Sequence, residues 1–355
     1  MANEITLSNI ARELNITPAT VSRALRNHPK ISAETKESVL RVASRLNYKR
    51  NKVASSLRSG KTHMIGVIIP SAEINFFGSV VHGIETVANV NGYNILIYQS
   101  NESYEHEVRG IETLLAARVD GIMVSIAKET VDYSHLTDVA KRGLPIVFFD
   151  RGNDNMGIPS VVIDDYKGAF IATERLIKQD YHRVAHIAGP QHVKVFNDRF
   201  KGYMAALQVN NMPFDPSLVF QGNISIESGK KAADYFLSLS ERPDAVFAVE
   251  DFCALGLMKS IKEHGLRIPE EFGIIGFANE LFGEHTTPSL STIDQQTVLM
   301  GKEAFKLLLE LVEKKDLAIA LQKKIVLEPI PIFRESSERK NHLKNQTDNP
   351  DNLSK

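Results

Sequence analysis

The sequence has few of the features that mark secreted, membrane-spanning or metal-binding proteins. Among 355 residues there is one cysteine, Cys253, which excludes a disulfide within the chain and gives no sign of a metal site. No run of about 18 apolar residues occurs, so no membrane span is expected. The N-terminus runs into the first predicted helix without the basic and apolar regions of a signal peptide, which favours a cytoplasmic location.

The motifs of common enzyme classes are also missing. No G-x-G-x-x-G follows the first predicted strand, so a dinucleotide site would lack the turn that holds its phosphates. Gly229 and Lys230 resemble the end of a phosphate-binding loop, but Lys231 stands where that loop requires Ser or Thr, and Gly222 is too far upstream. G-x-S-x-G and H-E-x-x-H do not occur. The sequence therefore predicts no cofactor, no metal and no enzymatic activity.

The chain does contain an uneven distribution of charge. Its 43% hydrophobic and 24% charged residues are typical of soluble globular proteins, and its length indicates two or three folding units. The formal net charge is −1, yet residues 1–61 hold 12 Lys and Arg against 4 Asp and Glu, and the remainder holds 30 against 39. A head of +8 on a body of −9 is typical of a nucleic-acid-binding domain joined to an acidic body.

Two short helices separated by a turn are predicted for residues 6–25. Apolar residues at positions 7, 10, 11 and 14 form one stripe of a first helix, which Thr6 is placed to cap. Asn15 tolerates the left-handed conformation that ends a helix, and Thr17 with Pro18 is typical of the start of the next. Positions 21, 24 and 25 are its apolar side. The residues expected to face outward are Thr20, Ser22 and Arg23.

This pattern fits a helix-turn-helix that reads the DNA major groove, or else an ordinary helical hairpin. The residues that follow favour the first interpretation. A third helix is predicted after Ser32, and its inward-facing residues are expected to be Val39, Leu40, Ala43 and Leu46. A basic, weakly apolar segment then occupies residues 48–60.

The two motifs T-L-S-N-I-A-R-E-L-N-I-T-P-A-T-V-S-R-A-L (6–25) and Y-K-R-N-K-V-A-S-S-L-R-S-G (48–60) together resemble the LacI/GalR family of bacterial transcription regulators. The resemblance extends to residue 335. It implies a helix-turn-helix domain at 1–50, a hinge helix and linker at 51–61, and an effector-binding and dimerisation body at 62–335. The polar composition of residues 336–355 predicts a disordered tail.

Apolar runs alternate with helical patterns throughout the body. Strands are expected at 64–70, 94–98, 121–124, 145–149, 161–163, 184–188, 218–221, 245–249 and 273–277. This alternation predicts an α/β fold with parallel sheets covered on both faces. The resemblance implies two lobes similar to those of periplasmic sugar-binding proteins, one of about 62–160 with 293–320 and the other of 161–290 with 321–335.

Arg23 is the strongest candidate for base contact, because a guanidinium can bond guanine in the major groove. Hydroxyls of the second helix are expected to contact phosphates, and Pro18 with Ala19 offers apolar surface to a thymine methyl. The resemblance implies that Leu57 wedges into the minor groove once residues 52–58 fold on DNA; a plain linker is the alternative. The full set expected to contact DNA is Thr6, Thr17, Pro18, Ala19, Thr20, Ser22, Arg23, Arg26, Lys30, Val53, Leu57 and Arg58.

An effector site is expected at the carboxyl ends of the strands, between the lobes. The predicted residues are Phe76, Phe77, Asp150, Arg151, Arg199, Ile224, Glu250, Asp251, Asn279 and Gln295. Arg199 lies in an R-x-x-G-Y motif that the resemblance identifies as a ligand clamp; a surface ion pair with Asp198 is the alternative. Asp150 and Asp251 could instead cap a helix or turn.

The sequence thus predicts a homodimeric regulator, most simply a repressor, that binds a pseudo-palindromic operator under the control of a small molecule such as a sugar or sugar derivative. A free solute-binding protein of the periplasmic type is the alternative, and a sugar-acting enzyme on the same scaffold is a third.

Overall fold

The computed structural model describes residues 5–48, 61–313 and 323–339. Two compact units, residues 1–62 and 63–355, are considered separately below. The predicted hinge contacts Val53, Leu57 and Arg58 lie outside the described residues, as does the tail from residue 340. Within those described, no helix is both long and apolar enough to cross a membrane.

The N-terminal unit is built from α1 (Leu7–Glu13), α2 (Pro18–Ala24) and α3 (Ala33–Arg45). The predicted end of α1 and the predicted start of α2 are confirmed. Asn15 has φ of 53° after α1, and the Thr17 hydroxyl accepts a hydrogen bond from the Thr20 amide at 3.1 Å, which caps α2. Ser32 caps α3 in the same way, through the Thr35 amide at 3.2 Å. The three helices enclose a small core in which Ile10, Val21 and Val39 are fully buried.

Two side chains of this unit point differently from the prediction. Leu40 was expected inward but is 57% exposed, because the buried stripe of α3 runs through Val39, Val42 and Ala43 and a residue one step along is turned about 100° away. Ser22 was expected to face outward but is only 9% exposed. Its hydroxyl accepts a hydrogen bond from Arg26 Nη2 at 2.9 Å, so a residue four positions along covers it.

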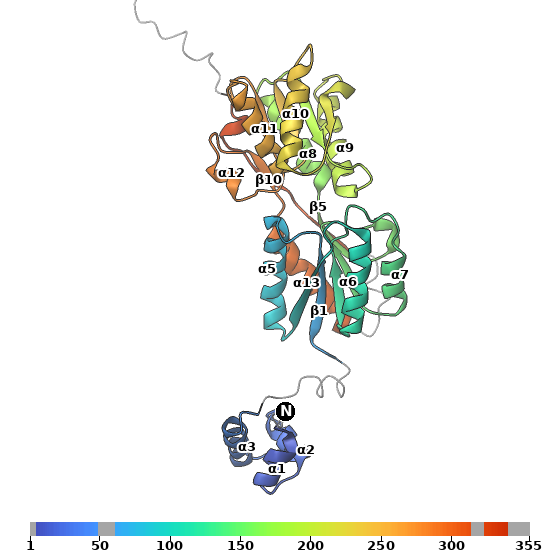
Figure 1. The fold of residues 1–355 in the computed structure, drawn as a ribbon, viewed down its shortest axis with the longest axis vertical. Helices are drawn as coiled ribbons and strands as arrows, with labels where there is room; N and C mark the ends of the chain where they lie inside the picture. The colour runs from blue at the N-terminus through green and yellow to red at the C-terminus, as the bar shows by residue number, and fades with distance from the viewer. Residues whose placement is uncertain (1–4, 49–60, 314–322, 340–355) are drawn as a thin grey trace, which may run out of the picture. The chain divides into compact units, whose positions relative to one another are not determined.

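The first lobe of the body contains a six-stranded parallel sheet in the order β11-β5-β4-β3-β1-β2 (Figure 1). Its strands are β1 (Met64–Ile69), β2 (Asn94–Gln99), β3 (Gly121–Val124), β4 (Ile146–Phe149), β5 (Ser160–Ile163) and β11 (Lys324–Leu327). One face packs against α5 (Asn75–Val90) and α13 (Thr297–Glu313), the other against α6 (Tyr104–Ala116) and α7 (Ser134–Lys141).

Glycines allow α5 and α13 to lie in close contact. A Cβ on Gly83 would be 2.2 Å from the Val298 carbonyl oxygen, and a Cβ on Gly301 would be 2.1 Å from that of Val80. Any larger side chain at either position would force the two backbones apart. Helix α13, which follows the second lobe in sequence, therefore packs on the first lobe, as the resemblance implied.

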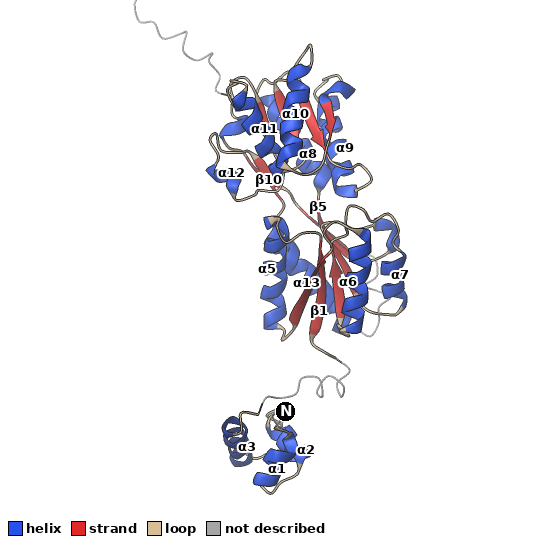
Figure 2. Ribbon diagram, viewed as in Figure 1, coloured by secondary structure: helices blue, strands red, loops and turns tan. Residues whose placement is uncertain are grey.

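The second lobe has a four-stranded parallel sheet in the order β7-β6-β8-β9, with helices on both faces (Figure 2). Its strands are β6 (Val184–Ala188), β7 (Val219–Gln221), β8 (Ala245–Ala248) and β9 (Gly273–Ile275). Its helices are α8 (Asp165–Lys178), α9 (Lys194–Val209), α10 (Ile226–Ser238), α11 (Asp251–Glu263) and the short α12 (Phe282–His285). An antiparallel pair, β10 (Thr292–Asp294) with β12 (Ile330–Ile332), completes the body.

The predicted lobe boundaries were wrong at two strands. The prediction gave β5 and β11 to the second lobe. In the structure Ser160 of β5 pairs with Phe148 of β4, and Lys324 of β11 pairs with Ser160, so both strands extend the first sheet. An apolar run indicates that a strand exists, but it does not indicate which sheet the strand joins.

The expected start of the tail at residue 336 was also wrong. Ser336 and Ser337 are fully buried in a single 3-10 turn, Glu335–Ser337. The Ser336 hydroxyl donates to the Ile274 carbonyl at 2.6 Å and accepts the Ser291 amide at 2.8 Å. Polar residues that pack by hydrogen bonding carry no hydrophobic signal, so their composition alone suggested disorder.

Candidate functional site

The outer side of α2 carries the residues predicted to meet DNA. Pro18, Ala19 and Arg23 are exposed, as the prediction for a reading helix requires. The Thr17 and Thr20 hydroxyls lie 3.0 Å apart, so the cap of the helix and the predicted phosphate contacts are the same groups. Thr6, Arg26 and Lys30 are also exposed.

Arg26 is partly engaged within the helix itself. Its Nε donates to the Ser22 carbonyl at 3.1 Å, in addition to the bond from Nη2 to the Ser22 hydroxyl. A guanidinium has five N–H donors, so three remain for a phosphate. Ser22 thus positions Arg26 and offers little free surface to DNA.

The body contains a small cavity, here called the inner cavity, whose lining comes from both lobes. Eight of the ten predicted effector residues line it: Phe76, Phe77, Asp150, Arg151, Arg199, Ile224, Glu250 and Gln295. Sequence reasoning missed the remaining lining residues, Ile74, Lys128, Val195, Phe196 and Ala278. The cavity volume is only about 40 Å³, enough for a few water molecules. A sugar-sized ligand would therefore enter only if the lobes moved apart.

Arg199 is the most constrained side chain of the inner cavity. It is 3% exposed, and Nε donates to Asp165 Oδ1 at 2.8 Å. Nη1 donates to the Val249 carbonyl at 2.8 Å and Nη2 to Gln295 Oε1 at 3.1 Å. The guanidinium also lies 3.7 Å from the centre of the Phe277 ring. The predicted alternative, a surface pair with Asp198, does not describe this buried arginine.

Three bonds hold the guanidinium of Arg199 in place and leave two of its five N–H donors. Burial raises the pKa of Asp165 to about 6, and the Arg199 charge opposes that rise. A preoriented donor pair beside a carboxyl of near-neutral pKa is suited to ligand oxygens.

Arg151 forms the opposite wall, in the first lobe. Its Nη1 donates to Glu102 Oε2 at 2.8 Å, and its guanidinium lies 5.7 Å from the centre of the Phe77 ring and 5.6 Å from that of Phe196. Its Nε is buried without a hydrogen bond to any residue that the structure describes, although Asp150 Oδ2 is 3.6 Å away. Because Arg151 follows β4 directly, its guanidinium lies at the inner cavity.

Two carboxyl groups near Arg151 respond to it differently. Burial raises the pKa of Glu102, but the charges of Arg151 and Lys128 outweigh that effect and leave the pKa below its usual value. For Asp150, burial dominates and raises the pKa despite Arg151 and a bond from the Ser125 hydroxyl at 3.2 Å. Asp150 caps no helix; it lies at a left-handed position, φ 59°, directly after β4.

Glu250 presents a carboxyl oxygen to the inner cavity. Its Oε2 accepts the Phe252 amide at 2.7 Å and so caps α11, whereas Oε1 is buried with no partner among the described residues. Burial and the neighbouring Asp251 carboxylate raise the pKa of Glu250 well above its usual value. A buried oxygen without a partner is costly, and a ligand group would satisfy it.

Asp251 and Asn279, although predicted, do not line the cavity. Asp251 is fully buried and accepts bonds from the Glu280 amide and the Thr292 hydroxyl, both at 2.8 Å, so it holds a turn, as the alternative had it. Asn279 donates to Asp294 Oδ2 at 3.0 Å and accepts from Arg334 at 3.1 Å. Neighbouring side chains after a strand point in different directions, and sequence alone does not select between them.

Two missed residues could have been found from helical spacing. Val195 and Phe196 precede Arg199 by four and three positions in α9 and therefore share its face.

Among the described residues no group of three or more His, Cys, Asp or Glu side chains is arranged to hold a metal ion.

Family comparison agrees with both units. Residues 6–51 match the model of bacterial regulatory proteins of the lacI family, and residues 62–337 match that of periplasmic binding proteins and the sugar binding domain of the LacI family. The chain belongs to the LacI family. It is therefore a DNA-binding transcriptional regulator with an effector-binding domain, in a family of regulators and not of enzymes. A free solute-binding protein would not account for residues 6–51.

Individual members of the LacI family are similar over most of their length. Catabolite control protein A of Priestia megaterium is 31% identical over 312 residues, and the HTH-type transcriptional repressor PurR of Vibrio atlanticus (strain LGP32) is 30% identical over 311. Each alignment covers 88% of this chain and 93% of the relative.

Solved structures agree with these sequence relatives. The Lac repressor dimer bound to operator and the anti-inducer ONPF has a TM-score of 0.85 at 25% identity, covering 94% of this chain and 99% of that one. The transcriptional regulator CelR in complex with cellobiose has a TM-score of 0.69 at 27% identity, with the same coverage.

Proposed function

We propose that this LacI-family regulator is a cytoplasmic repressor that binds a pseudo-palindromic operator as a homodimer, and that a sugar or sugar derivative in the inner cavity controls its affinity for DNA. The observation that carries the effector proposal is the buried, three-bonded Arg199 in a cavity lined from both lobes. Such a donor is oriented before a ligand arrives.

The chemistry of the inner cavity matches a polyhydroxylated ring. Phe76 and Phe77 supply apolar faces, Arg151 and Arg199 supply donors, and the unpartnered Oε1 of Glu250 accepts when the carboxyl is ionised and donates when it is protonated. Sugars present apolar C–H faces and hydroxyls that both donate and accept, so each kind of lining group has a counterpart. The cellobiose complex of CelR, a relative in structure, supports a carbohydrate effector.

The exposed side of α2 supports the DNA half of the proposal. Arg23 is placed to read a base, Pro18 and Ala19 to meet apolar base surface, and Thr17 and Thr20 to bond phosphates. One α2 covers only a half-site, so two copies are needed for a full operator. The wedge role of Leu57 and the DNA contacts of Val53 and Arg58 stay predictions, since these residues lie outside those described.

The coupling would be a shift between conformations of the lobes. The inner cavity is too small for a sugar, so binding requires rearrangement of contacts that join the lobes. One is His192 Nε2 with the Lys128 carbonyl, at 2.7 Å. Another is the Phe76 amide at the start of α5, which bonds the Glu280 carboxyl. A ligand that changes these contacts changes the population of the DNA-binding form.

The test uses the full chain and an operator selected from random DNA. Sugars, sugar phosphates and purines are titrated into the complex, and operator release or gain is followed by fluorescence anisotropy. We expect a sugar or sugar derivative to change operator affinity in the parent and to have no effect in Arg199→Ala, which should still bind DNA. A response to purines alone would refute the carbohydrate assignment.

A further inference from the structure

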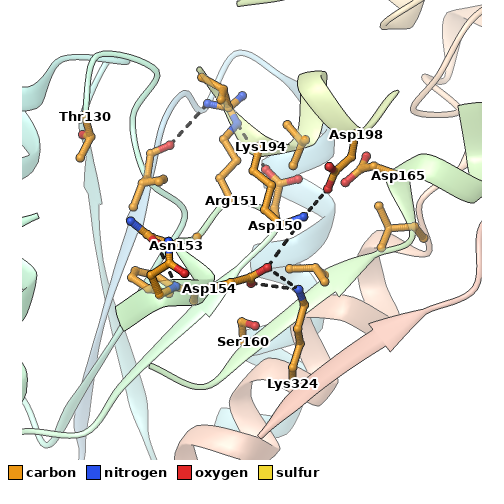
Figure 3. A pocket seen from close by; sticks show the side chains of 18 of the residues that line it. Thr130, Asp150, Arg151, Asn153, Asp154, Ser160, Asp165, Lys194, Asp198 and Lys324 are labelled. Carbon is orange, nitrogen blue, oxygen red and sulfur yellow. Dashed lines mark hydrogen bonds and ion pairs between the residues drawn. The ribbon is translucent and has the colours of Figure 1, made fainter. Parts of the chain in front are cut away.

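A second and much larger cavity, here called the side cavity, adjoins the inner cavity (Figure 3). Its volume is about 540 Å³. Its walls come from β4, β5 and β11, from the loop after β4, and from the start of α9 in the second lobe. Asp150, Arg151 and Val195 line both cavities, so these three residues form the wall between them.

The floor of the side cavity is part of the first sheet. Ser160 and Val162 of β5 and Val326 of β11 line it. The loop that roofs it begins at Gly152, where a Cβ would be 2.8 Å from Cβ of Phe148. The loop backbone at Gly152 therefore lies directly against the Phe148 side chain.

Charged side chains in the side cavity are arranged in pairs. Lys324 Nζ donates to both carboxylate oxygens of Asp154, at 2.9 and 2.8 Å, and Lys194 Nζ lies 3.8 Å from the same carboxylate (Figure 3). Lys194 also bonds Asp198. Lys194 belongs to the second lobe and Asp154 to the first, so this cluster joins the lobes across the cavity.

Other polar groups of the lining are deeply buried. Asp150, Arg151, Ser160 and Asp165 are each at least nine-tenths buried. Asp150 is paired with Arg151, and Asp165 with Arg199. These ion pairs fix the buried groups in the wall before any ligand is present, so the side cavity has preoriented polar side chains.

We propose that the side cavity is a second small-molecule site, distinct from the inner cavity, that takes an uncharged polyhydroxylated ligand the size of a mono- or disaccharide. Its volume falls within the roughly 300–1,000 Å³ of small-molecule sites. Its lysine, asparagine and hydroxyl donors alternate with aspartate acceptors, which suits hydroxyls that do both. Because its three cations, Arg151, Lys194 and Lys324, are already paired with aspartates, an anionic ligand would have to displace one of those carboxylates.

Two hydrogen bonds link a residue that lines only one cavity to a residue that lines only the other: His192 with the Lys128 carbonyl, and Arg199 with Asp165. Asp165 lines only the side cavity, Arg199 lines only the inner cavity, and Arg199 Nε donates to Asp165 Oδ1 at 2.8 Å. A ligand hydroxyl that bonds Asp165 therefore competes for or reorients the carboxyl that holds Arg199. Occupation of one site changes affinity at the other, and by thermodynamic reciprocity the factor is the same in both directions.

The experiment counts ligands on the full chain. Native mass spectrometry and calorimetry are run with D-glucose, D-ribose and cellobiose on the parent, on Val162→Phe, which fills the side cavity, and on Val209→Phe, a matched change at an exposed position of α9 outside both linings. We expect at least one probe to bind in two equivalents per chain to the parent and Val209→Phe, and in one equivalent to Val162→Phe.

Two further variants make the result decisive. Lys324→Met is the alternative variant in case Val162→Phe does not fold. It removes a donor that lines the side cavity and lies outside the inner cavity, so it should weaken binding of the second equivalent about tenfold or more. Arg199→Ala should weaken the other equivalent. If every probe binds in at most one equivalent, or if Val162→Phe and Lys324→Met leave both equivalents unchanged, the side cavity is not a ligand site. Failure of Arg199→Ala to affect either equivalent would instead refute the effector assignment.

Discussion

The protein holds its important arginines in two opposite ways. Arg23, on the reading helix of a head with net charge +8, is exposed and awaits its partner in DNA. Arg199, in the inner cavity, is buried and already makes three hydrogen bonds and a ring contact. The exposed Arg23 attracts DNA over a long range, and dissolved salt screens this attraction. The buried Arg199 presents donors in a fixed geometry, and salt screens its interactions much less.

This contrast shows how one chain separates two tasks. DNA supplies a dense array of negative charge, so a mobile exposed cation finds a partner wherever the groove places one. A small ligand supplies few groups, and only a preoriented site can distinguish it from similar molecules. The protein therefore fixes Arg199 in the body by three hydrogen bonds and leaves Arg23 exposed on the head.

The largest expected effect follows from this difference in exposure. Raising the salt concentration from 50 to 200 mM should weaken operator binding on the order of a thousandfold, because a dimer of +8 heads releases many counterions from phosphates. Affinity for a neutral effector should change by less than about twofold. Fluorescence anisotropy for DNA and calorimetry for effector test both. If the affinities for operator and for effector depended equally on salt, the proposed difference between the exposed head and the buried effector site would be wrong.

The hinge prediction has the next largest effect. Leu57→Ala should weaken operator binding about a hundredfold, because a wedge that unstacks a base step contributes a few kcal/mol. Melting temperature and effector affinity should stay those of the parent, since the wedge acts only on DNA. Leu40→Ala, a change at an exposed leucine of α3, is the matched control. Parent-like operator affinity in Leu57→Ala would show that residue 57 is only part of a linker.

Arg199→Ala should weaken effector binding about a hundredfold, since hydrogen bonds to a charged donor contribute roughly 1.5–3 kcal/mol. Operator binding should persist. Arg199→Lys should also fail, because one ammonium cannot replace a fork held by Asp165, Val249 and Gln295. Arg267→Ala, which breaks an exposed pair with Glu271, is the control and should change little.

The result is informative only for a folded variant. Arg199→Ala leaves Asp165 buried without its partner, so the melting temperature of the variant must be measured beside its affinity. Effector affinity within about twofold of the parent, in a variant that still melts cooperatively, would show that Arg199 serves the fold and not the ligand.

Most of the fold could be predicted because its signals are local. Apolar runs located the strands, and Thr17, Asn15 and Ser32 located the helix ends, since caps and left-handed positions depend on a few neighbouring residues. The assignment of β5 and β11 to a sheet failed because pairing partners are distant in sequence. The prediction that Ser22 faces outward was wrong because Arg26 covers it, and sequence periodicity does not indicate a hydrogen bond between two side chains.

The candidate site was predictable where its residues follow strands. The carboxyl ends of parallel strands meet at one edge, which brings Asp150, Arg151 and Glu250 together from separate segments. The same rule could not exclude Asp251, which differs from Glu250 by one position and points away. The side cavity had no sequence signal, because its volume depends on how a loop lies across the exposed part of a sheet.

Arg23→Ala should reduce operator affinity about tenfold and relax the choice of one base pair in each half-site, since a bidentate base contact contributes roughly 1–3 kcal/mol of discrimination. Arg41→Ala on α3 removes the same charge from an exposed position that pairs with Glu37. The salt dependence of operator affinity should decrease by a similar amount in both variants, and only Arg23→Ala should change the base preference. Selection of operators from random DNA by each variant measures this. If Arg23→Ala left the base preference unchanged while weakening binding, Arg23 would be a phosphate contact.

The smallest expected effect is a pH dependence of stability that originates beneath Arg199. The pKa of Asp165 rises from 3.8 to about 6 on folding, because burial outweighs the attraction of Arg199. The folded state therefore binds a proton that the unfolded state has released, and the stability that this proton contributes is present below pH 3.8 and is lost as the pH rises through 6. Between pH 5 and 7 the loss is roughly 1 kcal/mol.

Asp165→Asn cannot titrate, so its unfolding free energy should lack this part of the decline, while Asp138→Asn, at an exposed position of α7, should keep the parent's pH profile. Urea unfolding of the three proteins at pH 5, 6 and 7 gives the comparison. Other buried carboxyls, Asp251 and Glu280, also have pKa values of about 6 and contribute equally to all three proteins, so they cancel in the differences. If Asp165→Asn declined as steeply as the parent, the carboxyl beneath Arg199 would be ionised throughout, and the arginine would be held by a full ion pair at every pH tested.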